Sequence, residues 1–140
     1  MTRANEGVSA AGHSNPSWNG EQILQLDSRI RRVVVVGKMG EVQSVANRGL
    51  APVFATSDEL ERDDVGVGIR LALGASKKAA RYFGDSLYVI HSFREYKILF
   101  VEAPESERII AVVLPRSANS EPVYQKVAGF LKARPPGKAR

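Results

Sequence analysis

The chain has 140 residues, a length typical of one domain and too short for two. It contains no cysteine, which excludes disulfides, thiolate metal sites and thiol catalysis and is compatible with a reducing cytoplasm. The 20 Lys and Arg residues outnumber the 15 Asp and Glu residues, but four of these bases lie in the acid-free tail 132–140, so the sequence confines any nucleic-acid-binding role to that tail.

The two ends of the chain differ in composition from its centre. Residues 1–20 are rich in Gly, Ser, Asn and Ala without an apolar period, which predicts a disordered leader and no secretory signal. Trp18 is the exception, because an aromatic residue just before a helix can fold back onto the domain. The domain itself is expected at 21–131, with a flexible basic tail at 132–140. No apolar stretch is long enough for a membrane helix, so we expect a soluble, cytoplasmic protein.

The first predicted elements are a helix and a hairpin. Apolar residues at i, i+3 and i+7 within 21–32 predict a helix with one buried face. The β-branched run 33–36 predicts a strand buried on both faces, and the turn Gly-Lys-Met-Gly joins it to a second strand at 41–46. The apolar helix residues are Ile23, Leu26 and Ile30.

A long second helix is predicted at 58–83, with acidic residues in its first turns and basic residues in its last turns, as the helix dipole favours. Three glycines interrupt it, and we expect them to allow close approach of a neighbouring backbone. They do not form a dinucleotide-binding loop, because acidic helical sequence precedes them instead of a strand. The expected apolar face consists of Val65, Ile69, Leu73, Ala80 and Phe83.

Three strands and a helix complete the chain. The segments 86–93, 97–103 and 108–114 are rich in Val, Ile, Phe and Tyr, and their short polar connections predict an antiparallel meander. Ser120 is the expected N-cap of a third helix. Its apolar face consists of Val123, Val127, Phe130 and Leu131.

The order α-β-β-α-β-β-β-α resembles the Roadblock/dynein light chain family and its profilin-like relatives. The resemblance covers 21–131 and rests on the phrases LDSRIRRVVVVGKMGE, RGL and SLYVIHSFREYKILFVEAP, which look closest to Roadblock-like proteins of prokaryotes, archaea in particular. It implies an α+β fold with a five-stranded antiparallel sheet, the middle helix on one face and the terminal helices on the other.

The resemblance also implies a homodimer in which the third strand pairs across a two-fold axis and the middle helices pack together. The residues favour the same assembly, because SLYVIHSF is apolar on both faces and lacks proline, so it would promote aggregation as an uncovered edge. A histidine at this interface would make association depend on pH. The candidate interface residues are Ile69, Leu73, Ser76, Ala80, Leu87, Val89 and His91.

No residue pattern predicts catalysis, a metal or a cofactor. His13 and His91 have no second ligand at a suitable spacing, and the adjacent acidic residues have nothing near them that would raise a pKa. The sequence therefore favours a non-enzymatic dimeric adaptor or regulator, and the resemblance implies a small Ras-like GTPase or a scaffold protein as its partner. Two alternatives stay open: a small-ligand sensor related to PAS and GAF domains, with a pocket between sheet and helix, and a nucleic-acid binder acting through the basic tail.

Overall fold

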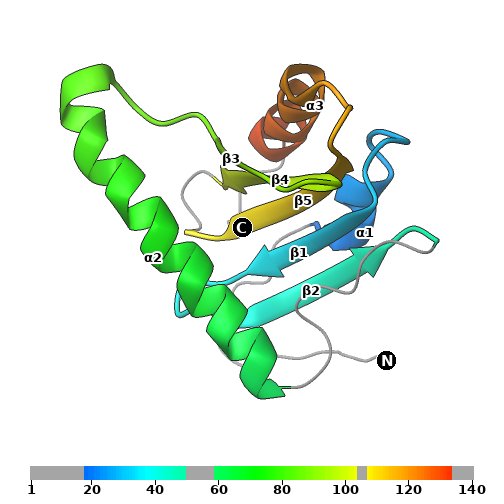
Figure 1. Cartoon of the computed structure of the whole chain (residues 1–140), viewed down its shortest axis with the longest axis horizontal. Helices are drawn as coiled ribbons and strands as arrows, with labels where there is room; N and C mark the ends of the chain where they lie inside the picture. The colour runs from blue at the N-terminus through cyan, green and yellow to red at the C-terminus, as the bar shows by residue number, and fades with distance from the viewer. Residues whose placement is uncertain (1–17, 50–58, 104–106, 134–140) are drawn as a thin grey trace.

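A computed structural model describes residues 18–49, 59–103 and 107–133 (Figure 1). It confirms the α+β class and the predicted order of elements. The strands are β1 (Arg32–Val36), β2 (Val42–Asn47), β3 (Val89–Ser92), β4 (Tyr96–Glu102) and β5 (Ile109–Pro115). The helices are α1 (Gly20–Leu24), α2 (Glu59–Phe83) and α3 (Ser120–Ala133).

The strands form one five-stranded antiparallel sheet in the order β2-β1-β5-β4-β3. Its central strand is β5, which pairs with β1 so that Val34 lies opposite Ala111 and Val36 opposite Ile109. All of β1 and almost all of β5 are buried. These strands are nearly continuous apolar runs because helices cover both of their faces.

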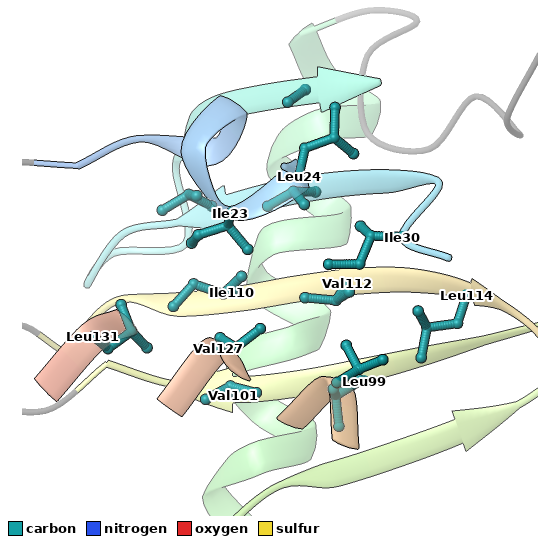
Figure 2. Close-up of a cluster of buried hydrophobic side chains, with 14 of the residues drawn as sticks. Ile23, Leu24, Ile30, Leu99, Val101, Ile110, Val112, Leu114, Val127 and Leu131 are labelled. Atoms are coloured by element: carbon teal, nitrogen blue, oxygen red, sulfur yellow. The ribbon is translucent and has the colours of Figure 1, made fainter. Parts of the chain in front are cut away.

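Helices cover the sheet on both sides, as the Roadblock resemblance implies: α2 crosses one face, and α1 and α3 lie on the other (Figure 1). Figure 2 shows the buried cluster on the α1 and α3 side, where Ile23 of α1 and Val127 of α3 meet residues such as Val112 of β5. A second cluster joins Ile69 and Leu73 of α2 to the opposite face of the sheet. The alternation of side chains along each strand therefore supplies two cores.

Helix α2 approaches the β1–β2 turn closely. A Cβ atom added to Gly66 would lie 1.7 Å from the carbonyl oxygen of Gly40, so only glycine fits there. Arg70 Nε donates to the carbonyl oxygen of Gly37 at 3.0 Å, and Lys77 forms a salt bridge with Glu102 at 3.0 Å. The expected close approach at a helix glycine exists, but the neighbour is a turn of the same chain.

The predicted first helix is wrong beyond Leu24. The chain continues in turns, with the Leu26 N–H donating to the Ile23 carbonyl at 3.0 Å and the Ile30 N–H donating to the Asp27 carbonyl at 3.1 Å. Asp27 Oδ1 also accepts from the Arg29 backbone N–H at 2.9 Å, which competes with helical hydrogen bonding. Ile30 is nevertheless fully buried, so apolar spacing identified core residues correctly but assigned them the wrong backbone.

Asp27 ties this turn region to α3. Its side chain is almost completely buried, accepts hydrogen bonds from the Arg29 guanidinium at 2.9 and 2.7 Å, and pairs with Lys126 of α3 at 3.0 Å. Hydrogen bonding to the Arg29 side chain, in first place, holds the pKa of Asp27 far below its usual range, against the opposing effect of burial. This carboxylate therefore stabilises the fold in its charged form.

Smaller corrections concern the third strand and the ends of two helices. Strand β3 is shorter than the predicted 86–93, because Tyr88 precedes the ladder and its hydroxyl donates to Glu121 of α3 at 2.6 Å. Phe83, expected on the buried face of α2, is exposed at the last helical residue. Asn119 Oδ1, and not Ser120, accepts from the Glu121 backbone N–H at 3.2 Å at the start of α3.

Trp18, which lies within the segment assigned to the leader, is 4% exposed and belongs to the core cluster on the α1 side. The Arg108 guanidinium lies over its ring at 5.9 Å. Asn19 then caps α1 reciprocally with Gln22. At the other end α3 continues to Ala133, and the tail residues 134–140 lie outside the described part of the chain, together with residues 1–17.

Candidate interaction surface

Strand β3 is an edge of the sheet, and β4 is its one neighbour among the described strands. It is also the least buried strand: Val89 is half-buried, and Ile90, His91 and Ser92 are exposed. Two large apolar side chains flank it, Leu87 at 63% exposure before the strand and Phe93 after it. An apolar edge without proline is a template for pairing with another strand.

The register with β4 shows where the β3 side chains point. Val89 lies opposite Phe100 and His91 opposite Ile98, both of which belong to the α2-facing core. Ile90 lies opposite Leu99, which belongs to the core on the α1 and α3 side. Because directly paired residues share a face, Val89 and His91 project to the α2 side and Ile90 to the other.

The same register shows which backbone groups are available. Phe93 N–H donates to the Tyr96 carbonyl at 2.8 Å, which closes the β3–β4 connection. In an antiparallel pair, residues alternate between groups that point to the neighbouring strand and groups that point away from it. The N–H and C=O groups of Ile90 and Ser92 therefore point away from β4, toward the free edge.

Helix α2 carries a second apolar side, opposite the one that packs on the sheet. Leu71 and Tyr82 lie on it at 74% and 75% exposure, with the exposed Lys78 between them, and Val67 lies at its border beside Gly40 of the β1–β2 turn. A Cβ atom added to Gly68 or Gly74 would meet no described atom within 4 Å beyond the helix itself, so this side is open as well as apolar. Figure 1 shows that the chain passes directly from the end of α2 to β3.

The structure divides the predicted interface residues between core and surface. Ile69 and Leu73 are buried against the sheet within one copy, and Ala80 is half-buried. The side chain of Ser76 lies outside the described part of the structure. The other three are at the β3 edge: Leu87 and His91 are exposed and Val89 is half-buried.

The sequence reasoning missed the exposed side of α2 and two residues of the edge. Leu71 follows Val67 by four residues and Tyr82 follows Leu71 by eleven, so helical periodicity contains a second apolar stripe. Ile90 and Phe93 belong to the predicted strand but are absent from the candidate interface residues. An alternation test along 86–93, applied to both faces of the strand, would have found them.

Contacts beside the edge hold the chain that leads into β3. The Tyr88 ring packs against Tyr124 of α3 with centroids 4.6 Å apart. The Glu121 carboxylate accepts the Tyr88 hydroxyl hydrogen bond, which lowers the pKa of Glu121 and raises the pKa of Tyr88. On the other face, the His91 and Phe93 rings stack at 4.4 Å. Aromatic contacts therefore flank the edge on both faces of the sheet.

Other chemistry is not indicated in the part of the chain that the structure describes. No three His, Asp or Glu side chains there come together as metal ligands. No helix among residues 18–49, 59–103 and 107–133 combines the length and apolarity needed to cross a membrane. Buried side chains fill both sheet faces in these segments, where the sensor alternative placed a ligand pocket.

Comparison with known proteins finds similarity in structure alone, since no protein-family model and no curated protein sequence matches the chain. A Roadblock/LC7 domain from Streptomyces avermitilis is 21% identical, with 86% of this chain and 94% of that chain covered and a TM-score of 0.56. The gliding protein MglB from Thermus thermophilus is 16% identical over 81% of this chain and 85% of its own, with a TM-score of 0.56. MglB from Myxococcus xanthus is 10% identical, with 81% of this chain and 91% of that chain covered and a TM-score of 0.55.

At these identities the likeness concerns the fold. The chain has the fold of Roadblock/LC7 domains, and the Roadblock resemblance read from its order of elements is confirmed at that level. Archaeal origin stays a prediction. One further MglB structure shows a tetrameric arrangement of that protein.

Proposed function

We propose that the protein is a non-enzymatic, dimeric adaptor or regulator of the Roadblock type that acts in the cytoplasm. The observation that carries the proposal is the β3 edge, which is apolar, exposed and unpaired among the described strands of a Roadblock-type fold. The occupant of this edge is a second copy of the chain. The predicted interface residues Leu87, Val89 and His91 belong to it.

The arrangement of the edge favours a self-complementary pairing centred on Ile90. Leu87 and Phe93 are equally distant from Ile90 along the chain, so antiparallel pairing about a two-fold axis at Ile90 sets each Leu87 opposite a Phe93. The outward-pointing backbone groups of Ile90 then face those of Ile90 in the second copy, and those of Ser92 face Tyr88. The open side of α2, around Leu71, adds apolar surface for the same contact.

A cysteine crosslink tests the register, since the chain has no cysteine of its own. Cα atoms of a hydrogen-bonded antiparallel pair are about 5.5 Å apart, within the range of a disulfide. Ile90→Cys should therefore form a crosslinked dimer under mild oxidation. Met39→Cys, 80% exposed on the β1–β2 turn, is the matched control and should stay monomeric on a denaturing gel. Equal crosslinking of the two variants would reject the register.

Sedimentation tests the dimer itself. The wild-type chain should sediment as a dimer at micromolar concentration, and Ile90→Asp should sediment as a folded monomer, because two like charges would lie directly opposite each other. Met39→Asp is the control and should stay dimeric. A wild-type chain that sediments as a monomer would refute the proposal.

The proposed partner is a small Ras-like GTPase or a scaffold protein, as the family resemblance implies. The exposed side of α2, with Leu71 and Tyr82, is a further apolar surface that supports a protein partner. Affinity purification from the native cell should recover that partner with the wild-type chain and lose it with Ile90→Asp if the dimer is the binding unit. If the wild-type chain and Ile90→Asp recover the same GTPase, partner binding does not depend on dimerisation.

A further inference from the structure

An open hollow of about 280 Å³ lies at the β3–β4 turn, away from both sheet cores. It is lined by Ser92, Phe93, Arg94 and Arg116. Arg94 and Arg116 come from different connections, one following β3 and the other following β5. The fold, and not the local sequence, brings their side chains to one place.

The backbone around the hollow is fixed. Arg116 N–H donates to the Glu95 carbonyl at 3.2 Å, which joins the two connections, and Phe93 N–H donates to the Tyr96 carbonyl at 2.8 Å. The two arginines therefore extend from backbone segments that are bonded to each other and to the sheet. The backbone of such a site loses little order when a ligand binds, and the ordering cost falls on the two exposed arginine side chains.

The two arginines at the hollow lack a paired carboxylate among the described residues. Neither Arg94 nor Arg116 makes an ion pair in the part of the chain that the structure describes. Glu95 is the one acidic residue within the β3–β4 turn, and it is exposed. Two guanidinium groups and the Ser92 hydroxyl are donors that suit the oxygens of a phosphate group, and guanidinium forks bind such oxygens in pairs.

An aromatic surface forms the remaining wall. Phe93 is 47% exposed, and its ring stacks on His91 with centroids 4.4 Å apart and an interplanar angle of 22°. One ring face is thereby supported and oriented. A planar ring of a ligand can stack on such an aromatic side chain, which adds selectivity to the attraction of the arginines.

We propose that this hollow binds a nucleoside monophosphate, with its phosphate between Arg94 and Arg116 and its base against Phe93. The volume, at the small end of ligand sites, suits a phosphate with one nucleoside. All four lining residues belong to one copy, so binding does not require the proposed dimer. A small molecule bound at this site could regulate the protein, although the site lies at a turn and not between the sheet and a helix.

Titration of the full chain with AMP, followed by nitrogen-edited NMR, tests the site. AMP should shift the signals of Ser92, Phe93, Arg94 and Arg116 in a saturable manner at millimolar concentration, whereas adenosine should not. Arg116→Gln and Arg94→Gln should each weaken AMP binding about tenfold or more, the loss expected for one charge-assisted contact. Arg81→Gln on α2 removes the same charge elsewhere and should leave the affinity unchanged.

Two further measurements decide what the site recognises. Inorganic phosphate should compete with AMP and bind more weakly, and Phe93→Leu should reduce AMP affinity to that of phosphate. Equal binding of phosphate and AMP by the wild-type chain would overturn the nucleoside assignment. No saturable shift with AMP, or unchanged affinity in both arginine variants, would overturn the site. In the proposed dimer Phe93 lies opposite Leu87 of the second copy, so the Ile90→Asp monomer should bind AMP at least as tightly as the wild type. Failure of this site is therefore distinguishable from failure of the dimer.

Discussion

Replacing Gly66 with alanine adds a methyl group where α2 crosses the β1–β2 turn. Its Cβ would lie 1.7 Å from the Gly40 carbonyl oxygen, whereas real Cβ atoms essentially never come within 3.0 Å, so helix and turn must separate by about 1.3 Å. That movement also disturbs the Arg70 hydrogen bond to Gly37 and the packing of Ile69. The variant therefore tests whether this contact positions α2.

Two opposing effects set the expected magnitude. Alanine is favoured over glycine inside a helix by about 1 kcal/mol. Overpacking typically costs about 1–3 kcal/mol, and here a rigid backbone carbonyl opposes the methyl group, so about 3 kcal/mol applies. The net loss for Gly66→Ala is about 2 kcal/mol, or about 8 °C in Tm for a domain of this size.

Urea unfolding at one fixed protein concentration measures the effect, because association would otherwise change the apparent stability. Gly68→Ala is the matched control, since no atom lies within 4 Å of its added Cβ. It should stabilise the chain by up to about 1 kcal/mol. If Gly66→Ala proves as stable as Gly68→Ala, the close approach of α2 to the turn does not exist in solution.

Three other substitutions test separate contacts. Asp27→Asn should cost about 2–3 kcal/mol of unfolding free energy at pH 7, because Arg29 and Lys126 both lose their carboxylate partner. The folded state lowers the pKa of Asp27, so its contribution to stability is present above about pH 4 and is lost as the pH falls further. Urea unfolding at pH 3 should therefore show a smaller difference from the wild type than at pH 7, and an equal difference would contradict this linkage. Tyr88→Phe should cost less than about 1 kcal/mol and raise the pKa of Glu121 toward its ordinary value, as carboxyl NMR titration can measure, and an unmoved pKa would reject the hydrogen bond. Trp18→Ala should cost about 3–4 kcal/mol in thermal unfolding, whereas Met39→Ala, at an exposed turn, should be neutral, and equal effects would place Trp18 outside the core.

The local sequence predicted an element correctly where the residue types within that element determine its structure. The valine run of β1 is buried along its whole length, as four consecutive β-branched residues predict. The helix prediction failed after Leu24 because the Asp27 carboxylate accepts hydrogen bonds from the backbone and side chain of Arg29 and from the side chain of Lys126. Lys126 is 99 residues away in the chain. Apolar spacing contains no information about such a partner.

The candidate surface was predicted in part. The sequence identified 86–93 as a strand that needs a cover, and Leu87 and His91 are exposed at the sheet edge. It did not identify the hollow at Arg94, because Arg116 reaches that place through the pairing of β4 with β5. A single sequence contains no signal that two distant residues are brought together by strand pairing.

By itself the sequence determined the kinds of elements and their order, because β-branched runs and helical periodicity act over neighbouring residues. Only the tertiary structure decided which side of α2 meets the sheet and which residues come together at the β3–β4 turn. Helix α2 has two apolar sides, one with Ile69 and Leu73 and one with Leu71 and Tyr82. Periodicity shows which residues share a side, but burial depends on the surface that covers it, and that surface comes from distant parts of the chain.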